Sequence, residues 1–340
     1  MTAYHYVGLD VHKKMIAYCI KRVDGEIVDE GKVRATRRDL EAWSERLPKP
    51  WMGAMEATLF TDWVYDFLKP RANEIKVGHS LMLKAICASK KKNDRLDARK
   101  ICDALRLDWF PESYMAPSDL RELRRVLRYR NLLVREATRM KNKTAGLLME
   151  SGAEYNKKRL HGKRYFNELV DGLDYVSPSV IELLRHSRSN MEVFESAQKR
   201  LVRALREEPL LKERLELLMS IPGVGEITAL TWALEVGDPS RFRSVKKAVS
   251  FCGLCSAQSE SAGKTRRGPL SKQRNKHLQT ILIEAAKLAP RWSPQLKAVH
   301  EKALERGANR NQATVAVARK LVAYLLYVDK NQKEFEPRGE

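Results

Sequence analysis

The chain has 340 residues, a formal net charge of +21 at pH 7 and a sequence pI of about 9.8. Its hydrophobic fraction of 43% is ordinary for a globular protein and excludes wholesale disorder, and its length suits two or three domains. No apolar run approaches the roughly 20 residues that span a bilayer, so the positive charge indicates nucleic acid as the partner and no membrane.

Strand and helix patterns alternate along the first third of the chain. Short or alternating apolar runs bounded by turn residues predict strands at 4–11, 15–23, 26–35, 51–57 and 74–79. Helical spacing predicts helices at 37–47, at 58–69 with Thr58 as N-cap, and at 93–107 with Asn93 as N-cap. The Asp24-Gly25 step predicts a hairpin turn between the second and third strands. Hairpin strands followed by β-α-β units predict an α/β domain, a mixed sheet with helices on its faces.

The middle of the chain is predicted to be helical. One long amphipathic helix runs from Pro117 to about Ser151, and further helices at 179–205 and 210–220 follow an irregular basic segment at 154–166. One narrow face of the long helix, here called the basic stripe, carries Arg121, Arg125, Arg128, Arg135, Arg139 and Lys143. Such a face is either solvated or bound to phosphate, and both interpretations stay open.

The last third begins with a tight turn between two helical stretches, SIPGVGEITALTWALEVGD. Gly223 and Gly225 give this turn the helix–hairpin–helix pattern, whose backbone N–H groups can hold a phosphate; the alternative is a plain helical corner. A serine-, glycine- and base-rich segment at 256–279 is predicted to be a loop, and helices at 275–289 and 311–329 finish the fold.

Five cysteines are scattered along the chain, which argues against a disulfide framework and fits a reducing cytoplasm. Cys252 and Cys255 form a CxxC pair, but no second pair of Cys or His stands at the spacing of a zinc site. Small core residues beside Gly253 are therefore the favoured interpretation. The N-terminal MTAYHYVGLD lacks the basic-then-apolar order of a signal peptide, which agrees with a cytoplasmic protein.

Four acids stand out against the basic background. Asp10 and Glu56 each close a predicted strand, and Asp94 and Asp97 share a helix face inside the basic run KKKNDRLDARK. Singly, each is more often a surface residue with ordinary ion pairs. Together they can form one cluster, whose repulsion a divalent cation relieves, and oxygen ligands favour Mg²⁺ or Mn²⁺. Two such ions can clamp an in-line phosphoryl transfer.

The motifs GLDVHKK, AMEAT, KNDRLDAR, SIPGVGEITA and FCGLCSAQSESAGKTRRG resemble, in this order, those of the IS110 family transposases, which include the Piv-type DNA invertases. The resemblance implies a RuvC-like (RNase H-like) domain at 1–113, a helical coiled-coil segment at 114–208 and a mostly α transposase domain with the helix–hairpin–helix at 209–330. It implies that Asp10, Glu56, Asp94 and Asp97 form the metal-binding DEDD tetrad.

The same resemblance places the nucleophilic serine at Ser261. From the residues alone Ser256, Ser259, Ser261 and Ser271 all stay open, because a loop serine is usually a turn former. The family commonly has glycine directly after the serine, whereas here Ala262 precedes Gly263. Phosphate contacts are expected from the basic stripe, from the glycine turn and from the cations around the serine, which are Lys264, Arg266, Arg267, Lys272 and Arg274.

The implied function is that of a transposase or site-specific recombinase of an insertion sequence. The resemblance implies cleavage and exchange of donor and target DNA through a phosphoserine–DNA intermediate, guided by a structured noncoding bridge RNA. It also implies dimers or tetramers, acting in the bacterial cytoplasm at the nucleoid. Two main alternatives remain: a metal-dependent RuvC-like junction nuclease without a covalent intermediate, and a noncatalytic nucleic-acid-binding protein. A third and weaker alternative is binding to a membrane surface through the basic helix.

Overall fold

A computed structural model describes residues 4–87 and 93–337, and it divides the chain into two compact units, Met1–Ser118 and Asp119–Glu340. Each unit is described by itself. The lysines that open the basic run, 90–92, lie outside the described residues.

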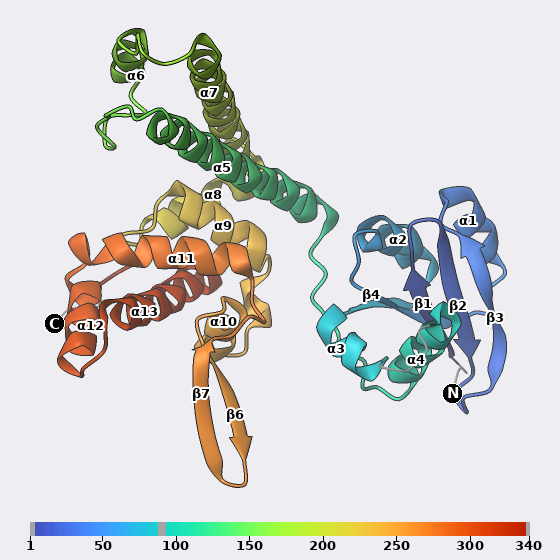
Figure 1. The fold of residues 1–340 in the computed structure, drawn as a ribbon. Coiled ribbons are helices and arrows are strands. Elements are labelled where there is room, and N and C mark those ends of the chain that lie inside the picture. The colour runs from blue at the N-terminus through green and yellow to red at the C-terminus, as the bar shows by residue number, and fades with distance from the viewer. Residues whose placement is uncertain (1–3, 88–92, 338–340) are drawn as a thin grey trace. The chain divides into compact units, whose positions relative to one another are not determined.

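The first unit is built on a five-stranded mixed sheet (Figure 1). The strands are β1 (His5–Val11), β2 (Met15–Lys21), β3 (Ile27–Arg34), β4 (Trp51–Glu56) and β5 (Glu74–Gly78). Their order is β3-β2-β1-β4-β5, with antiparallel pairs among the first three strands in the chain and parallel pairs from β1 to β4 and from β4 to β5. The predicted mixed sheet with helices is confirmed.

Helices cover both faces of this sheet. The core of one face joins strand residues such as Leu9 and Ile16 to α1 (Arg37–Glu45) and α2 (Thr61–Leu68). The other face is covered by α4 (Asp94–Arg106), whose Ala98 and Cys102 pack on β2. A short helix that the sequence did not predict, α3 (Ser80–Ile86), precedes α4.

The start of α2 differs from the prediction. Its N-cap is Phe60 rather than Thr58, because side-chain hydrogen bonds hold residues 58–60 in a turn. The Thr61 hydroxyl accepts from the Thr58 backbone N–H at 2.7 Å and donates to the Glu56 carbonyl at 2.9 Å. Asn93 is the N-cap of α4, as predicted, and its side chain accepts from the Arg95 N–H.

Helix α4 touches the backbone of β1 at Gly8. A Cβ atom at this position would lie 2.1 Å from the Ala98 carbonyl oxygen and 2.5 Å from the Cys102 nitrogen. The Cys102 thiol also donates a hydrogen bond to the Tyr6 carbonyl at 3.1 Å. Only glycine leaves room for this approach, so Gly8 sets the depth at which the helix lies on the sheet.

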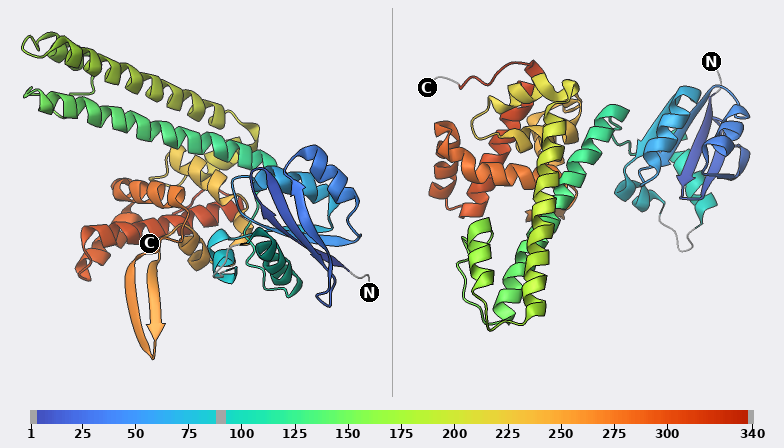
Figure 2. Two further views of the ribbon diagram at one scale, coloured as in Figure 1. Left: turned by 45° about the vertical axis from the view of Figure 1, so that its right-hand side comes forward. Right: turned by 90° about the horizontal axis from the view of Figure 1, so that it is seen from above.

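The second unit is mostly helical. Its helices are α5 (Ser118–Glu150), α6 (Lys163–Asp171), α7 (Pro178–Arg206), α8 (Pro209–Met219), α9 (Glu226–Val236), α10 (Val245–Phe251), α11 (Lys276–Leu288), α12 (Pro294–Glu305) and α13 (Arg310–Asn331). Helices α5 and α7 run side by side (Figure 2), joined by the ion pair of Lys141 and Glu195 at 2.8 Å. The main core surrounds α9, which is buried from Thr228 to Val236.

Three predictions for this unit were wrong. Helix α6 lies partly in the segment expected to be irregular; its Phe166 and Val170 join a small core that the basic composition concealed. Helix α12, with Ser293 as N-cap, was not predicted. The expected loop contains a β-hairpin of β6 (Ser256–Ser261) and β7 (Lys264–Leu270), which has no apolar alternation because its strands are exposed.

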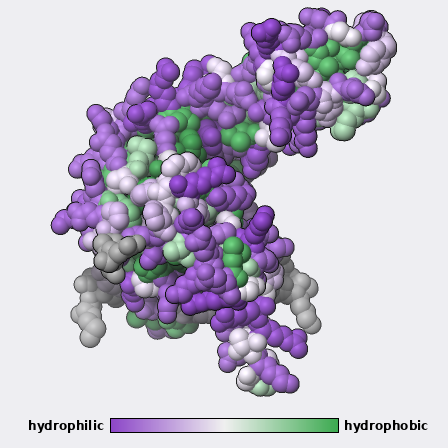
Figure 3. All heavy atoms as spheres, turned by 90° about the vertical axis from the view of Figure 1, so that its left-hand side faces the viewer, coloured by the Kyte–Doolittle hydropathy of each residue, from purple (hydrophilic) through white to green (hydrophobic). Residues whose placement is uncertain are grey.

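No helix in the described part of the chain is long and apolar enough to cross a membrane. In the space-filling view of Figure 3, hydrophilic residues cover most of the visible face and hydrophobic residues form scattered patches.

We expect Gly8→Ala to push α4 off the sheet, because the new methyl group would overlap the helix backbone. The cost should be about 1–3 kcal/mol or more, and hydrogen exchange of peptides covering 94–106 should accelerate. Gly146→Ala is the control: it lies in α5 with nothing within 4 Å of the new Cβ, and alanine should stabilise the helix slightly. Native protection of α4 in Gly8→Ala would contradict the assigned role.

Candidate functional site

Two of the predicted acids lie on neighbouring strands. Successive residues of a strand alternate between faces, so Asp10 points to the same face as Gly8, toward α4. The parallel pairing of β1 and β4 aligns Gly8 with Ala54 and Leu9 with Met55, so the next residues in this register are Asp10 and Glu56. Neighbouring strands are about 4.8 Å apart, which brings these two carboxylates to one end of the sheet.

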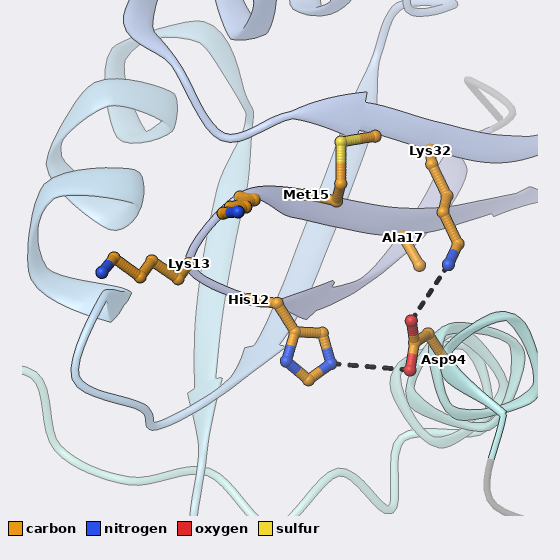
Figure 4. A pocket seen from close by; sticks show the side chains of 7 residues that line it. His12, Lys13, Met15, Ala17, Lys32 and Asp94 are labelled. Atoms are coloured by element: carbon orange, nitrogen blue, oxygen red, sulfur yellow. Dashed lines mark hydrogen bonds and ion pairs between the residues drawn. The ribbon is translucent and has the colours of Figure 1, made fainter.

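Helix α4 adds Asp94 to this end. The Nε2 atom of His12 lies 3.1 Å from Oδ2 of Asp10 and 3.7 Å from Oδ1 of Asp94. Figure 4 shows the imidazole beside Asp94, with Lys32 of β3 donating to the same carboxylate at 3.0 Å. One ligand atom from each of Asp10, His12 and Asp94 lies within 4.8 Å of the others, an arrangement that can hold a metal ion.

The pKa shifts of Asp10 and of the Cys87 thiol depend on the charges of the predicted acids. Burial raises the pKa of Asp10, His12 opposes this, and the charges of Asp94 and Asp97 add to the rise. The pKa of the Cys87 thiol is also raised, first by burial and then by the carboxylates of Asp97, Glu56 and Asp10, while the charge of Lys100 opposes the rise. Within the described residues, the group whose ligand atoms lie within 4.8 Å of one another is Asp10, His12 and Asp94, and neither Glu56 nor Asp97 is part of it.

The pKa of Asp94 is lowered, chiefly by the hydrogen bond from Lys32. Asp94 therefore stays ionised under conditions that favour protonation of the buried Asp10. A cavity of about 430 Å³ beside the Asp94 carboxylate is lined by His12, Lys13, Lys14 and Lys32, among others. The site thus combines carboxylates that suit a cation with lysines that suit a phosphate.

The cations around the two aspartates have structural partners. Arg95 and Arg99 both bind Glu30 of β3, and the Arg99 guanidinium does so through two hydrogen bonds of 2.6 Å. Lys100 donates to the Cys87 carbonyl at 2.9 Å. The basic run therefore contains arginines that tie α4 to the edge strand and an aspartate, Asp94, that lies beside His12 and Asp10.

The donor set suits a hard divalent cation. Carboxylate oxygens are the usual ligands of Mg²⁺ and Mn²⁺, and an imidazole nitrogen is better matched to Mn²⁺ than to Mg²⁺. Among Asp10, His12 and Asp94, the buried Asp10 gains most, since a bound cation would offset its loss of hydration.

Ser261 lies at the end of β6, and its Cα is paired with that of Lys264. The turn between them is Ala262-Gly263, with φ values of 49° and 75°, so an alanine occupies the left-handed region where the family pattern commonly has glycine. Ser261 is exposed, as are Lys264, Arg266 and Arg267.

The base of this hairpin is anchored in the helical core. Asn275 is the N-cap of α11 and donates to the carboxylate of Glu235 at 2.7 Å. Arg128 of α5 binds the same carboxylate through two bonds of 2.8 Å. Burial raises the pKa of Glu235, but the contacts with Arg128, Asn275 and Arg124 outweigh it and the pKa lies below its ordinary value.

The arginines of the basic stripe lie in different environments. Arg121 is buried, at 5% exposure, and Arg128 is bound to Glu235, so these two guanidinium groups have roles within the fold. Arg139 pairs with Glu136 at 2.9 Å. Arg125 and Arg135 are exposed.

The other expected phosphate contacts also differ in their surroundings. Gly223 lies in the turn after α8, where a Cβ would come 2.5 Å from that of Ala289, and Gly225 is the N-cap of α9. Lys272 and Arg274 are both exposed, and Arg274 also packs over Gly253 and donates to the Ser271 carbonyl at 3.0 Å. The CxxC cysteines are free thiols, and Cys252 is buried.

Comparison with known proteins identifies the family. A DEDD transposase model of the IS110 group matches residues 7–152, and a model described as "Transposase IS116/IS110/IS902 family" matches residues 215–301. The chain belongs to the IS110 family of transposases. It is accordingly an enzyme of DNA strand cleavage and transfer, with a DEDD nuclease domain, as the sequence motifs predicted.

Among its relatives, a probable family 20 transposase of Pseudomonas aeruginosa is 25% identical over 84% of each chain. The transposase for insertion sequence element IS1111A of Coxiella burnetii is 29% identical over 67% of this chain and 64% of its own. A pilin gene-inverting protein of Moraxella bovis is 24% identical over 54% and 56%, respectively.

Sequence reasoning missed two residues of the candidate site, His12 and Lys32. His12 follows Asp10 by two positions, and strand periodicity directs both side chains to one face; this signal was present in GLDVHKK. Lys32 comes from an edge strand whose contact with α4 depends on the fold, so no local pattern indicates it.

Removing one carboxylate should weaken metal binding. We expect Asp94→Asn to lower the affinity of the full chain for Mn²⁺ at least about tenfold, measured by electron paramagnetic resonance without nucleic acid. Asp108→Asn is the control, because Asp108 is exposed and its φ of 55° is one that asparagine adopts. Equal Mn²⁺ affinities in the two variants would exclude Asp94 as a ligand.

Loss of the buried acid at position 235 should loosen the anchor of α5 and of the hairpin. Glu235→Ala leaves Arg128 and Asn275 without their partner and should cost about 3–5 kcal/mol in unfolding free energy. Because its folded pKa is lowered, the contribution of Glu235 is present above the ordinary glutamate pKa and is lost as the pH falls through the folded pKa. Denaturant unfolding measures both effects, with the exposed Glu213→Ala as control.

Proposed function

We propose that this transposase cleaves and rejoins donor and target DNA with two sets of groups: the carboxylates Asp10, Glu56, Asp94 and Asp97, and the hydroxyl of Ser261. The observation that carries the proposal is the gathering of acids at one end of β1, β4 and α4, beside lysines suited to phosphate. The strand order, with three antiparallel strands followed by two parallel ones, supports a RuvC-like domain.

A Mg²⁺ or Mn²⁺ ion bound by the four carboxylates would supply Lewis-acid stabilisation of the charge that develops during phosphoryl transfer. The protein's own contribution is positioning. Asp10 and Glu56 are held on paired strands and Asp94 and Asp97 on one face of a helix fixed against them, so the carboxylates need not reorganise during reaction. Lys32 and Lys13 can hold the oxygens of a bound phosphodiester.

Ser261 is proposed as the nucleophile. Its Oγ–H loses a proton, a bond forms between Oγ and phosphorus, and the bond from phosphorus to one sugar oxygen breaks, leaving that sugar as a hydroxyl after it takes up a proton. The phosphoserine ester keeps the bond energy of the cleaved strand, so religation needs no ATP. The exposure of Ser261 at a hairpin end supports this role.

A bridge RNA is proposed as the guide, with base pairing reading the sequence of both DNAs while the protein holds backbone and shape. The net charge of +21 supports a protein that holds two polyanions. We further propose dimers or tetramers through α5 and α7, in which Ser261 of one subunit meets the acids of another, acting at the nucleoid in the cytoplasm.

The test of the nucleophile is a trapped covalent adduct. A labelled duplex carrying the ends of the element should become attached to the full chain, and Ser261→Ala should abolish the attachment. Ser259→Ala should retain it, since Ser259 lies two residues away on the same strand and matches the substitution in size and exposure. Denaturing gels with the labelled strand measure the adduct.

Other outcomes of the same experiment identify the alternatives. Strand cleavage without adduct in wild type and unchanged in Ser261→Ala would indicate a metal-dependent nuclease that uses water. Cleavage unaffected by Asp10→Asn and Glu56→Gln would contradict the role of the acids, and binding without any cleavage would indicate a noncatalytic protein.

A further inference from the structure

The hairpin that carries Ser261 has no buried face. All residues from 257 to 269 are exposed, and among the residues that the structure describes β6 and β7 pair only with each other. A two-stranded hairpin of this kind is marginally stable in water by itself. Its side chains therefore do not serve a core, and their chemistry indicates what the hairpin contacts.

The register separates its polar side chains into two faces. Residues directly opposite each other in an antiparallel pair project to the same side, and successive pairs alternate. Ser261 is paired with Lys264 and Ser259 with Arg266, so these four residues share what we call the serine face. Glu260 is paired with Thr265 and Gln258 with Arg267, and these four form the opposite face.

The two faces differ in charge. The serine face carries two hydroxyls and two cations and no acid, whereas on the opposite face the positive charge of Arg267 is offset by Glu260. Within the described residues, the side chains of Lys264 and Arg266 form no hydrogen bond or ion pair. In contrast, Arg99 and Arg128 are each bound to a carboxylate of the fold.

From this separation we propose that Lys264 and Arg266 of the serine face bind a DNA phosphodiester by contacting the non-bridging oxygens of the phosphate in front of Ser261, while Ser259 takes no part in this contact. Arg267 lies outside this site, although it is adjacent in sequence and equally basic. The inference rests on the proposed role of Ser261 and adds the residues that position its substrate. An ammonium directly opposite the Ser261 hydroxyl and a planar guanidinium two residues further along the same strand suit a tetrahedral phosphate.

The test compares Arg266→Gln with Arg267→Gln. Both remove one positive charge from adjacent, exposed positions, so long-range electrostatics change equally and only direct contact differs. In the Ser261→Ala background, binding of a labelled random-sequence DNA duplex is measured over a range of salt concentrations. Arg266→Gln should weaken binding several-fold and reduce the slope of log K against log salt by about one, and Arg267→Gln should leave the slope near that of the parent.

Measuring DNA binding in the Ser261→Ala variant tests the phosphate site independently of the proposed covalent reaction. Binding still reports on Lys264 and Arg266 if no covalent adduct ever forms. With Ser261 present, Arg266→Gln should also reduce the yield of adduct at least about tenfold while Arg267→Gln retains it. Thermal unfolding of each variant checks that the fold is intact.

Two results would overturn the proposal. Equal effects of Arg266→Gln and Arg267→Gln on the salt slope would mean that the hairpin contributes charge without a defined site. A difference between the variants that appears with an RNA hairpin and not with the DNA duplex would assign the serine face to RNA.

Discussion

The close approach of α4 to β1 at Gly8 determines the geometry of the acid site. A strand advances about 3.4 Å per residue and a helix about 1.5 Å, so two strand residues and four helix residues cover similar lengths. Ala98 lies against Gly8. Asp10 is two residues further along β1 and Asp94 is four residues earlier in α4, and both carboxylates approach His12. Since like charges repel, backbone packing and not mutual attraction brings these acids together.

The ion pairs explain how so basic a chain holds its helices in place. Glu30 binds two arginines of α4, Glu235 joins α5 to the base of the hairpin, and buried Asp329 accepts from Arg214 and from the Trp232 indole. These acids are almost excluded from water, so each arginine bound to them is committed to the fold. The arginines available to nucleic acid are therefore fewer than the basic composition suggests, although pairing with acids leaves the net charge of +21 unchanged.

Much of this arrangement could be predicted from the sequence, and the failures have physical causes. The strands of the first unit and the Asn93 cap follow from periodicity and capping, because local chemistry determines them. The same patterns singled out Asp10 and Asp94, which the structure places beside His12. The role of Arg121 and Arg128 could not be predicted, since helical spacing gives a face and not what covers it. The hairpin was missed because strands without a buried side carry no apolar alternation.

The acid site and the hairpin that carries Ser261 are held in place in different ways. The carboxylates lie on strands and a helix whose packing fixes them before any ligand arrives, which is the condition for electrostatic preorganisation. The hairpin depends on backbone pairing alone, and its position is held at the base by Asn275 and Glu235. As the proposed nucleophile, Ser261 would reach its working geometry when DNA covers the serine face, because the phosphates would neutralise Lys264 and Arg266 and support the strands. DNA binding would thereby be coupled to the positioning of the Ser261 hydroxyl, because both depend on the same hairpin.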